Sequence, residues 1–143
     1  MEKVRVLVAD DHEFIRNCIV KLIARECLVV ASVANGREVI DSFDELHPDI
    51  VVLDIAMPEM NGIEAVNELR RKGRRPKILF VSNSCDQALV EAARDCGASG
   101  YIAKPHAAEE LIPALRAIAD GGTHFSQTIG GSRQPRKNSG NTP

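Results

Sequence analysis

Short apolar runs alternate with longer amphipathic runs along most of the chain. Residues 4–9 are apolar except for Arg5, whereas residues 12–25 carry apolar side chains at intervals of three and four. A short apolar run is typical of a buried strand, and the longer spacing is typical of a helix with one face on a core. This part of the sequence therefore predicts a strand followed by a helix.

Four further units of the same kind follow the first. The predicted strands cover residues 28–33, 49–53, 77–81 and 99–103, and the predicted helices cover residues 37–46, 63–72, 86–96 and 108–119. Continuously apolar strands suit a parallel sheet with both faces covered, and strict alternation favours right-handed crossovers. We therefore expect an α/β fold, a three-layer α/β/α sandwich around a five-stranded parallel sheet. The pattern alone does not give the strand order.

Pro113 conflicts with the helical pattern of residues 108–119. Inside a helix, proline lacks an N–H donor and clashes with the carbonyl group four residues earlier. We expect this helix to begin late, so that Pro113 falls in its first turn, or to kink at Pro113.

Composition and charge narrow the class of protein. Of the 143 residues, 44% are apolar and 27% are charged, and the net charge is -2. These values are ordinary for a globular protein and give no case for binding of nucleic acid or membrane by the whole chain. No apolar run approaches the roughly 18 residues of a membrane span, and residues 1–3 lead into a strand rather than a signal sequence, so we expect a cytoplasmic location. The four cysteines have no CxxC spacing, and we expect reduced thiols.

The C-terminal residues differ from the rest of the chain. Residues 126–143 contain one large apolar side chain, Ile129, and three basic residues, Arg133, Arg136 and Lys137, without an acidic one. Burial in such a segment cannot offset the entropy lost on ordering it. We expect one domain over residues 1–122, followed by a polar, basic and disordered tail over residues 123–143.

Polar residues follow four of the five predicted strands. Asp10 and Asp11 follow the first strand, Asp54 follows the third, Ser82 the fourth and Lys104 the fifth. The carboxyl ends of parallel strands meet at one edge of a sheet, and ligands bind in the crevice there. We therefore expect these five side chains to gather at one site.

The chemistry of this set favours phosphoryl transfer. Three carboxylates in one crevice repel each other, so the site needs a proton or a cation. Oxygen ligands suit a hard divalent ion such as Mg²⁺, which binds one or two carboxylates together with phosphate oxygens. The nucleophile would be a carboxylate, since no Ser–His or Cys–His pair is evident. Lys104 and the Ser82 hydroxyl would then bind phosphate oxygens.

The same residues resemble a known family. The pair Asp10-Asp11, the run DIAMPEMNG at residues 54–62, Ser82 and the pair Lys104-Pro105 are similar in order and spacing to the receiver domains of two-component response regulators. The resemblance covers residues 4–120 and rests on several separated elements rather than one short pattern. It implies a flavodoxin-like fold with strand order 2-1-3-4-5 and a receiver domain over residues 1–122.

The resemblance also implies roles for the acidic residues. Asp54 would be the phospho-acceptor, which takes a phosphoryl group from a sensor histidine kinase or a phosphotransfer protein. Asp11, Asp54 and the backbone carbonyl of Ala56 would bind Mg²⁺ or Mn²⁺ directly. Asp10 would bind the same ion through a water molecule.

Lys104 and Ser82 complete the implied set, as the groups that bind the phosphoryl oxygens. The Lys104-Pro105 bond is expected to be cis, as it is in relatives. Tyr101 falls at the aromatic switch position of the family, where movement of Ser82 toward the phosphoryl group would leave room for Tyr101 to turn inward. The face made by the fourth helix, the fifth strand and the fifth helix would then change shape for a partner. A plain core tyrosine is the alternative.

Four possibilities stay open at this point, and the least favoured is a pseudo-receiver that keeps the fold without phosphorylation, because the complete acidic set and Lys104 argue against it. The first is a stand-alone receiver that acts on a downstream protein target, with a homodimer as a further option. The second is the receiver part of a transcriptional regulator without its DNA-binding domain, because residues 100–104 and 119–125 resemble receivers that precede helix-turn-helix domains. The third is an aspartyl-nucleophile phosphatase, but Ala56 stands where such an enzyme has its general acid. We expect a phosphorylation switch rather than an enzyme, with no membrane contact and no DNA binding by this chain as written.

Overall fold

The computed structural model describes residues 3–84 and 86–126. Strands and helices alternate along the chain, as the hydrophobic pattern predicts. The strands are β1 (Arg5–Ala9), β2 (Leu28–Val33), β3 (Ile50–Leu53), β4 (Lys77–Ser82), β5 (Gly100–Ala103) and β6 (His124–Phe125). The helices are α1 (Glu13–Ile23), α2 (Gly36–Leu46), α3 (Gly62–Arg71), α4 (Gln87–Asp95) and α5 (Ala107–Ala119), and a 3₁₀ turn, η1 (Lys104–His106), precedes α5.

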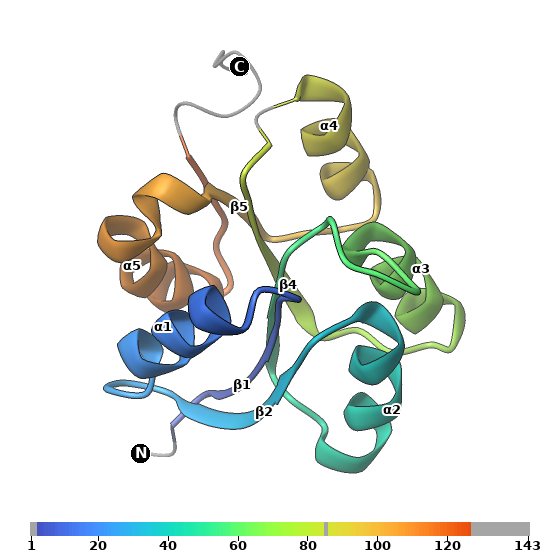
Figure 1. The fold of residues 1–143 in the computed structure, drawn as a ribbon, viewed down its shortest axis with the longest axis horizontal. Helices are drawn as coiled ribbons and strands as arrows, with labels where there is room; N and C mark the ends of the chain where they lie inside the picture. Colours follow the sequence, from blue (N-terminus) through green and yellow to red (C-terminus); the bar gives the residue numbers. More distant parts are fainter. Residues whose placement is uncertain (1–2, 85, 127–143) are drawn as a thin grey trace.

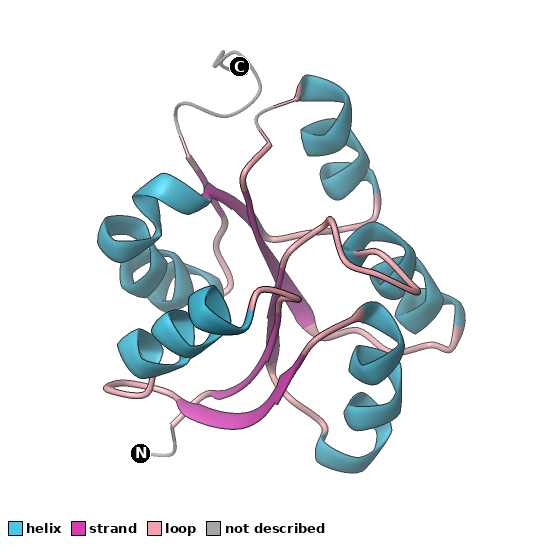
Figure 2. Ribbon diagram, in the orientation of Figure 1, coloured by secondary structure: helices cyan, strands magenta, loops and turns pink. Residues whose placement is uncertain are grey.

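The strands form one parallel sheet between two layers of helices. The strand order is β2-β1-β3-β4-β5-β6, which confirms the order 2-1-3-4-5 and adds a short sixth strand. Helices α1 and α5 cover one face of the sheet, and α2, α3 and α4 cover the other (Figures 1 and 2). The flavodoxin-like three-layer sandwich is therefore confirmed.

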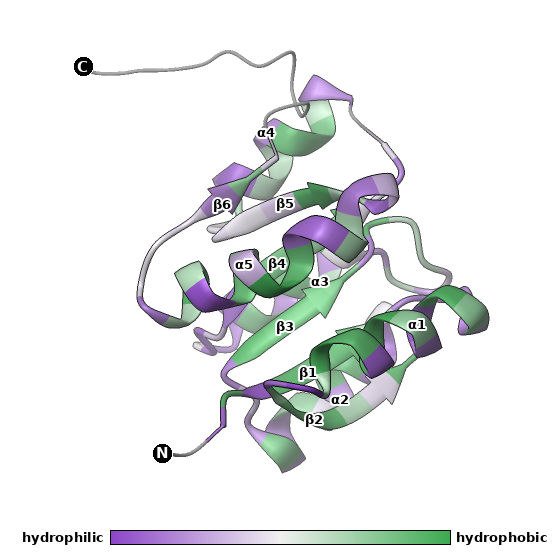
Figure 3. Cartoon of the chain, turned by 90° about the vertical axis from the view of Figure 1, so that its left-hand side faces the viewer, coloured by the Kyte–Doolittle hydropathy of each residue, from purple (hydrophilic) through white to green (hydrophobic). Residues whose placement is uncertain are grey.

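The apolar side chains of the strands divide between the two faces, because successive residues of a strand point to opposite sides. Leu7, Val51 and Phe80 lie in the cluster that packs under α2, α3 and α4. Val6 and Ile102 lie in the second cluster, under α1 and α5. The members of both clusters are buried, and Figure 3 shows mainly hydrophobic strands between helices that carry both hydrophobic and hydrophilic residues. Burial on both faces explains why the strands read as continuous apolar runs.

The fifth helix departs from the expectation at Pro113. Helix α5 begins at Ala107, so Pro113 lies well inside it, and the expected late start is wrong. The buried residues Leu111, Ala114 and Leu115 hold the helix on the sheet from both sides of the proline. Pro113 itself is exposed, so water can bind the carbonyl group that a proline leaves without a helical N–H.

Strand β6 lies within residues 123–143, the segment expected to form a disordered tail. His124 and Phe125 pair with Gly100 and Tyr101 of β5. The rest of the expected tail, residues 127–143, lies outside the described residues. Cys18, Cys27 and Cys96 are free thiols, and among the described helices none is long and apolar enough to cross a bilayer.

Candidate functional site

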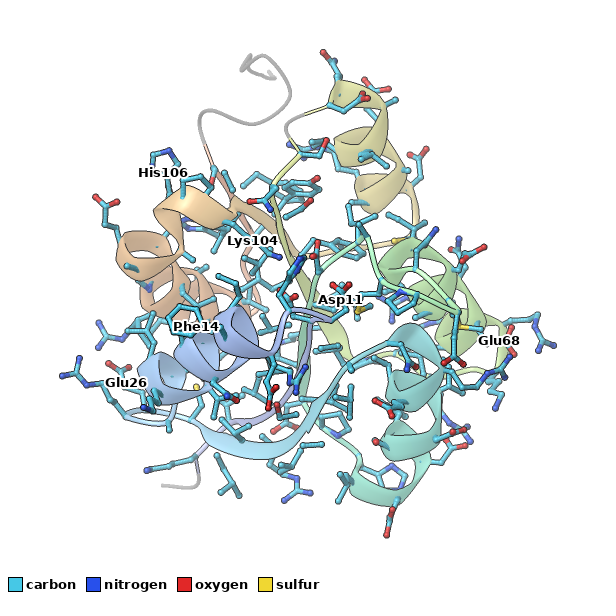
Figure 4. The ribbon with its side chains drawn as sticks, in the orientation of Figure 1. Asp11, Phe14, Glu26, Glu68, Lys104 and His106 are labelled. Carbon is cyan, nitrogen blue, oxygen red and sulfur yellow. The ribbon has the colours of Figure 1, made fainter. Side chains whose placement is uncertain are left out.

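The candidate site lies at the carboxyl edge of the sheet. Register places Ala9 beside Leu53 and Ser82 beside Ala103, so the residues that follow β1, β3 and β5 emerge together. Backbone hydrogen bonds continue the alignment past the strand ends, since the Asp54 N–H donates to the Ala9 carbonyl at 3.0 Å. The topology therefore gathers the predicted side chains, and Figure 4 shows Lys104 and Asp11 near each other at this edge.

Asp54 is buried and held on two sides. Its Oδ1 accepts a hydrogen bond from the Ile55 N–H at 2.7 Å, and its Oδ2 accepts one from Lys104 Nζ at 2.8 Å. Lys104 comes from the end of β5 and reaches across β4 to make this contact. The carboxylate is therefore fixed in direction, with its two oxygens in different surroundings.

Asp10 is equally buried and meets the same lysine. Its Oδ1 accepts a hydrogen bond from the His12 N–H at 2.9 Å, at the start of α1. Its Oδ2 lies 2.8 Å from Lys104 Nζ, which is the distance of an ion pair, but it has no hydrogen-bond partner among the described residues. An ion pair without good hydrogen-bond angles leaves this buried oxygen only partly satisfied.

The Asp10 carboxylate belongs to a cluster of four potential metal ligands. One ligand atom from each of Asp10, Asp11, His12 and Asp54 lies within 4.8 Å of the others. Asp11 and His12 are exposed, whereas the other two are buried. His12 is the N-cap residue of α1, and its ring lies 3.3 Å from Asp11. The nearness of the ring to a ligand atom of Asp54 could not be read from sequence spacing.

The charges in this pocket do not balance. Three carboxylates face one ammonium group, that of Lys104. Burial lowers the pKa of Lys104, but its contacts with Asp10 and Asp54 outweigh burial and raise the pKa above the ordinary value. Lys104 is therefore charged, and an excess of negative charge remains. The donor set of carboxylate oxygens and the partly satisfied Asp10 Oδ2 fit a hard divalent cation.

Ser82, at the end of β4, and Tyr101, in β5, both contact Ser84 in the loop before α4. The Ser82 side chain is buried, and its hydroxyl oxygen accepts a hydrogen bond from the Ser84 N–H at 3.1 Å. Tyr101 is fully buried, and its hydroxyl donates to the Ser84 carbonyl at 3.0 Å. Both residues therefore contact the loop between β4 and α4. Their roles in switching stay predictions.

The Lys104-Pro105 bond corrects one expectation. No peptide bond is cis among the described residues, so the expected cis bond is wrong. Residues Lys104, Pro105 and His106 form the η1 turn that leads into α5, with Pro105 at its beginning. Proline suits the first position of a helical turn because its fixed φ is already helical and its missing N–H would be unpaired there. Lys104 contacts Asp54 although the peptide bond between Lys104 and Pro105 is trans.

Comparison with known proteins agrees with this geometry. The family model of the response regulator receiver domain matches residues 6–116. The chain belongs to the response regulator receiver family. It is 40% identical to the chemotaxis protein CheY of Thermotoga maritima over 116 residues, which cover 80% of this chain and 97% of CheY.

Receivers with further domains are also similar. The chain is 35% identical to the nitrate/nitrite response regulator protein NarL of Escherichia coli K12 over 130 residues, which cover 90% of this chain and 60% of NarL. Among solved structures, a two-component response regulator of the LuxR family from Aurantimonas sp. SI85-9A1 superposes with a TM-score of 0.85 at 33% identity, covering 91% of this chain and 94% of that one. The chain thus spans nearly all of CheY and about three fifths of NarL.

Family and geometry together assign the class of protein. The chain is a receiver-domain phospho-acceptor of a two-component system, and its acidic pocket is made by Asp10, Asp11 and Asp54 together with Lys104. The acidic cluster is typical of the metal site of receivers. A receiver is a signalling protein and not a classical enzyme, so the phosphatase alternative loses its support.

Proposed function

We propose that Asp54 accepts a phosphoryl group from a phosphohistidine of a sensor histidine kinase or a phosphotransfer protein. The observation that carries the proposal is the contact of a buried Asp54 carboxylate with Lys104, inside a cluster of acidic ligand atoms. A carboxylate oxygen of Asp54 attacks phosphorus in line, the phosphorus–nitrogen bond breaks, and histidine leaves with its electron pair. The product is an acyl phosphate.

Positioning and charge neutralisation supply the catalysis in such a transfer. Lys104 holds Asp54 before the reaction and moves its contact to a phosphoryl oxygen of the product. The Ser82 hydroxyl, which lies at the end of the neighbouring strand, donates to a second phosphoryl oxygen. Burial of Asp54 and Lys104 strengthens these interactions because less water screens them.

The ion that fits the acidic pocket is Mg²⁺ or Mn²⁺. Asp11, Asp54 and the backbone carbonyl of Ala56 would hold it directly, and Asp10 would hold it through water. When bound, the ion neutralises the charge that develops on the phosphoryl oxygens. Ala56 follows Asp54 by two residues, in the exposed loop before α3.

In the proposed function, the face made by α4, β5 and α5 passes the signal to a binding partner. We propose that Ser82 and Tyr101 change position after phosphorylation and alter this face for a downstream protein or a second copy of the chain. The similarity to NarL over three fifths of its length supports a second version, in which the chain is the receiver part of a transcriptional regulator. Phosphotransfer from a kinase in the cytoplasm is part of both versions.

Acetyl phosphate and Mg²⁺, followed by intact-mass measurement, test the proposal. We expect one phosphate adduct on the wild type and none on Asp54→Asn. Asp41→Asn is the matched control, because Asp41 lies exposed on α2 and should leave the adduct unchanged. A wild type that stays unmodified, or an adduct that survives in Asp54→Asn, would overturn the assignment of Asp54.

A further inference from the structure

Strand β6 contacts all three elements of the α4–β5–α5 face. It extends the sheet beyond β5, where the His124 N–H donates to the Ser99 carbonyl at 3.0 Å and the Ser126 N–H donates to the Tyr101 carbonyl at 2.9 Å. Figure 3 shows β6 beside β5, between α4 and α5. The edge of β5 is therefore covered by the chain's own C-terminal segment rather than open to a partner.

Phe125 connects β6 to α4 and to the core beneath it. It pairs in register with Tyr101 and packs against the buried cluster that contains Tyr101. On α4, the Arg94 guanidinium lies 3.8 Å from the centroid of the Phe125 ring, which is a cation–π contact. Phe125 thus lies beside Tyr101 in the sheet, packs on the same buried cluster and is contacted by Arg94 of α4.

Glu110 connects β6 to α5. Its Oε1 accepts a hydrogen bond from the Ser126 hydroxyl at 2.6 Å and lies 3.1 Å from His124 Nε2. Burial raises the pKa of Glu110, but the contacts with Ser126 and His124 outweigh it, so the pKa is below its ordinary value. Ser126 is buried by these contacts. The neighbouring Glu109 is exposed, and its Oε1 lies 3.8 Å from His106 Nδ1 rather than against β6.

We propose that β6 is a latch on the α4–β5–α5 face, whose docking on β5 is coupled to the inward position of Tyr101. The proposal rests on the proposed function of Asp54 and Tyr101. Docked β6 and inward Tyr101 occur together in this structure, and phosphorylation favours inward Tyr101 in the proposed switch. Coupling between two sites is reciprocal, so phosphorylation of Asp54 strengthens the docking of β6, and docked β6 strengthens phosphoryl binding at Asp54.

The size of β6 suits a switch rather than a fixed edge strand. Two residues pair with β5, and the strand is held by a few backbone bonds, one cation–π contact and the Glu110 contacts. Segments with few buried contacts open far more readily than the core around them. A modest bias from Tyr101 is therefore enough to change how often β6 is docked, and with it the access of a partner to the edge of β5.

Hydrogen exchange of the full chain tests the latch. The backbone amides of His124 and Ser126 report docking, because they donate to the carbonyl of Ser99, directly before β5, and to the carbonyl of Tyr101 in β5. Exchange is measured by NMR with Mg²⁺ alone and with Mg²⁺ plus saturating beryllofluoride, a mimic of the phosphoryl group. We expect beryllofluoride to slow exchange of both amides by about fivefold or more, the lower end of ordinary coupling between sites.

A matched pair of variants tests the reverse direction. Glu110→Ala removes both contacts to β6, whereas Glu109→Ala makes the same side-chain deletion one residue away. We expect Glu110→Ala to speed exchange of the two amides and to raise the beryllofluoride concentration for half-saturation by about twofold or more. Glu109→Ala should change neither quantity.

The outcomes separate the two proposals. A wild type that fails to bind beryllofluoride at Asp54 would overturn the proposed function, and the latch with it. Beryllofluoride binding that leaves exchange at His124 and Ser126 unchanged, or makes it faster, would overturn the latch alone. Equal beryllofluoride concentrations for half-saturation of Glu110→Ala and Glu109→Ala would also overturn the latch alone.

Discussion

Gly62, the first residue of α3, lies directly against the backbone of Asp54. A Cβ atom at this position would come 2.2 Å from the Asp54 carbonyl oxygen and 3.0 Å from Ile55 Cα. Both neighbours are backbone atoms that cannot rotate away. Gly62→Ala therefore requires a shift of the chain that carries the proposed phospho-acceptor.

The size of that shift sets the expected effect. Real Cβ contacts are essentially never shorter than 3.0 Å, so the two segments must separate by roughly 1 Å, and a misplacement of that size can cost about 100-fold in rate. Overpacking of this kind also costs about 1–3 kcal/mol of stability. We expect Gly62→Ala to fold and to lose about 100-fold in the rate of phosphorylation by acetyl phosphate.

Gly36→Ala is the matched control. Its Cβ atom would also come 2.2 Å from a carbonyl oxygen, but this oxygen belongs to Met60, not to Asp54. Urea unfolding gives the stability of each variant, and intact mass against time gives the rate. We expect similar losses of stability in both variants and a much smaller loss of rate in Gly36→Ala. Phosphorylation of Gly62→Ala at the wild-type rate would show that the contact of Gly62 with Asp54 does not position the carboxylate.

Two further predictions concern charged groups. Removing Lys104 leaves the buried carboxylates without their cation, so Lys104→Met should lose about 3 kcal/mol of stability in EDTA and slow phosphorylation by roughly 100-fold. Recovery of stability on adding Mg²⁺ would support the cation site, and equal stability of variant and wild type in EDTA would contradict the charge argument. Glu110 faces His124, His106 and Ser126, and its pKa is lower in the folded protein than in the unfolded chain. The stability that the ionised Glu110 contributes to the docked β6 is therefore present above pH 4.5 and is lost as the pH falls through the pKa of the folded state. The amide shifts of His124 and Ser126 should therefore move toward unfolded values as the pH falls below 4.5, and an equal movement in Glu110→Ala would count against this reading.

The residues at the strand ends show how much of the site can be predicted from the sequence. Asp10, Asp54, Ser82 and Lys104 could be placed at one edge because chain direction and strand alternation are local properties of the sequence. The approach of the His12 ring to the Asp54 carboxylate could not be placed in this way, since the two residues follow different strands and the direction of the ring is not a local property of the sequence. The same limit explains the wrong expectation of a cis bond before Pro105, which came from relatives rather than from the turn that these residues form.

Strand β6 could not be predicted from the sequence pattern. Two residues between a glycine turn and a polar segment carry no periodicity, and they become a strand only because β5 offers an open edge and Glu110 and Arg94 offer partners. The order of the elements and the residues that end each strand can be read from the amino-acid sequence, because periodicity needs only near neighbours. Tertiary structure alone decided the ion pair of Lys104 with Asp54, 50 residues apart, and the docking of β6, because such contacts arise only when distant segments pack together.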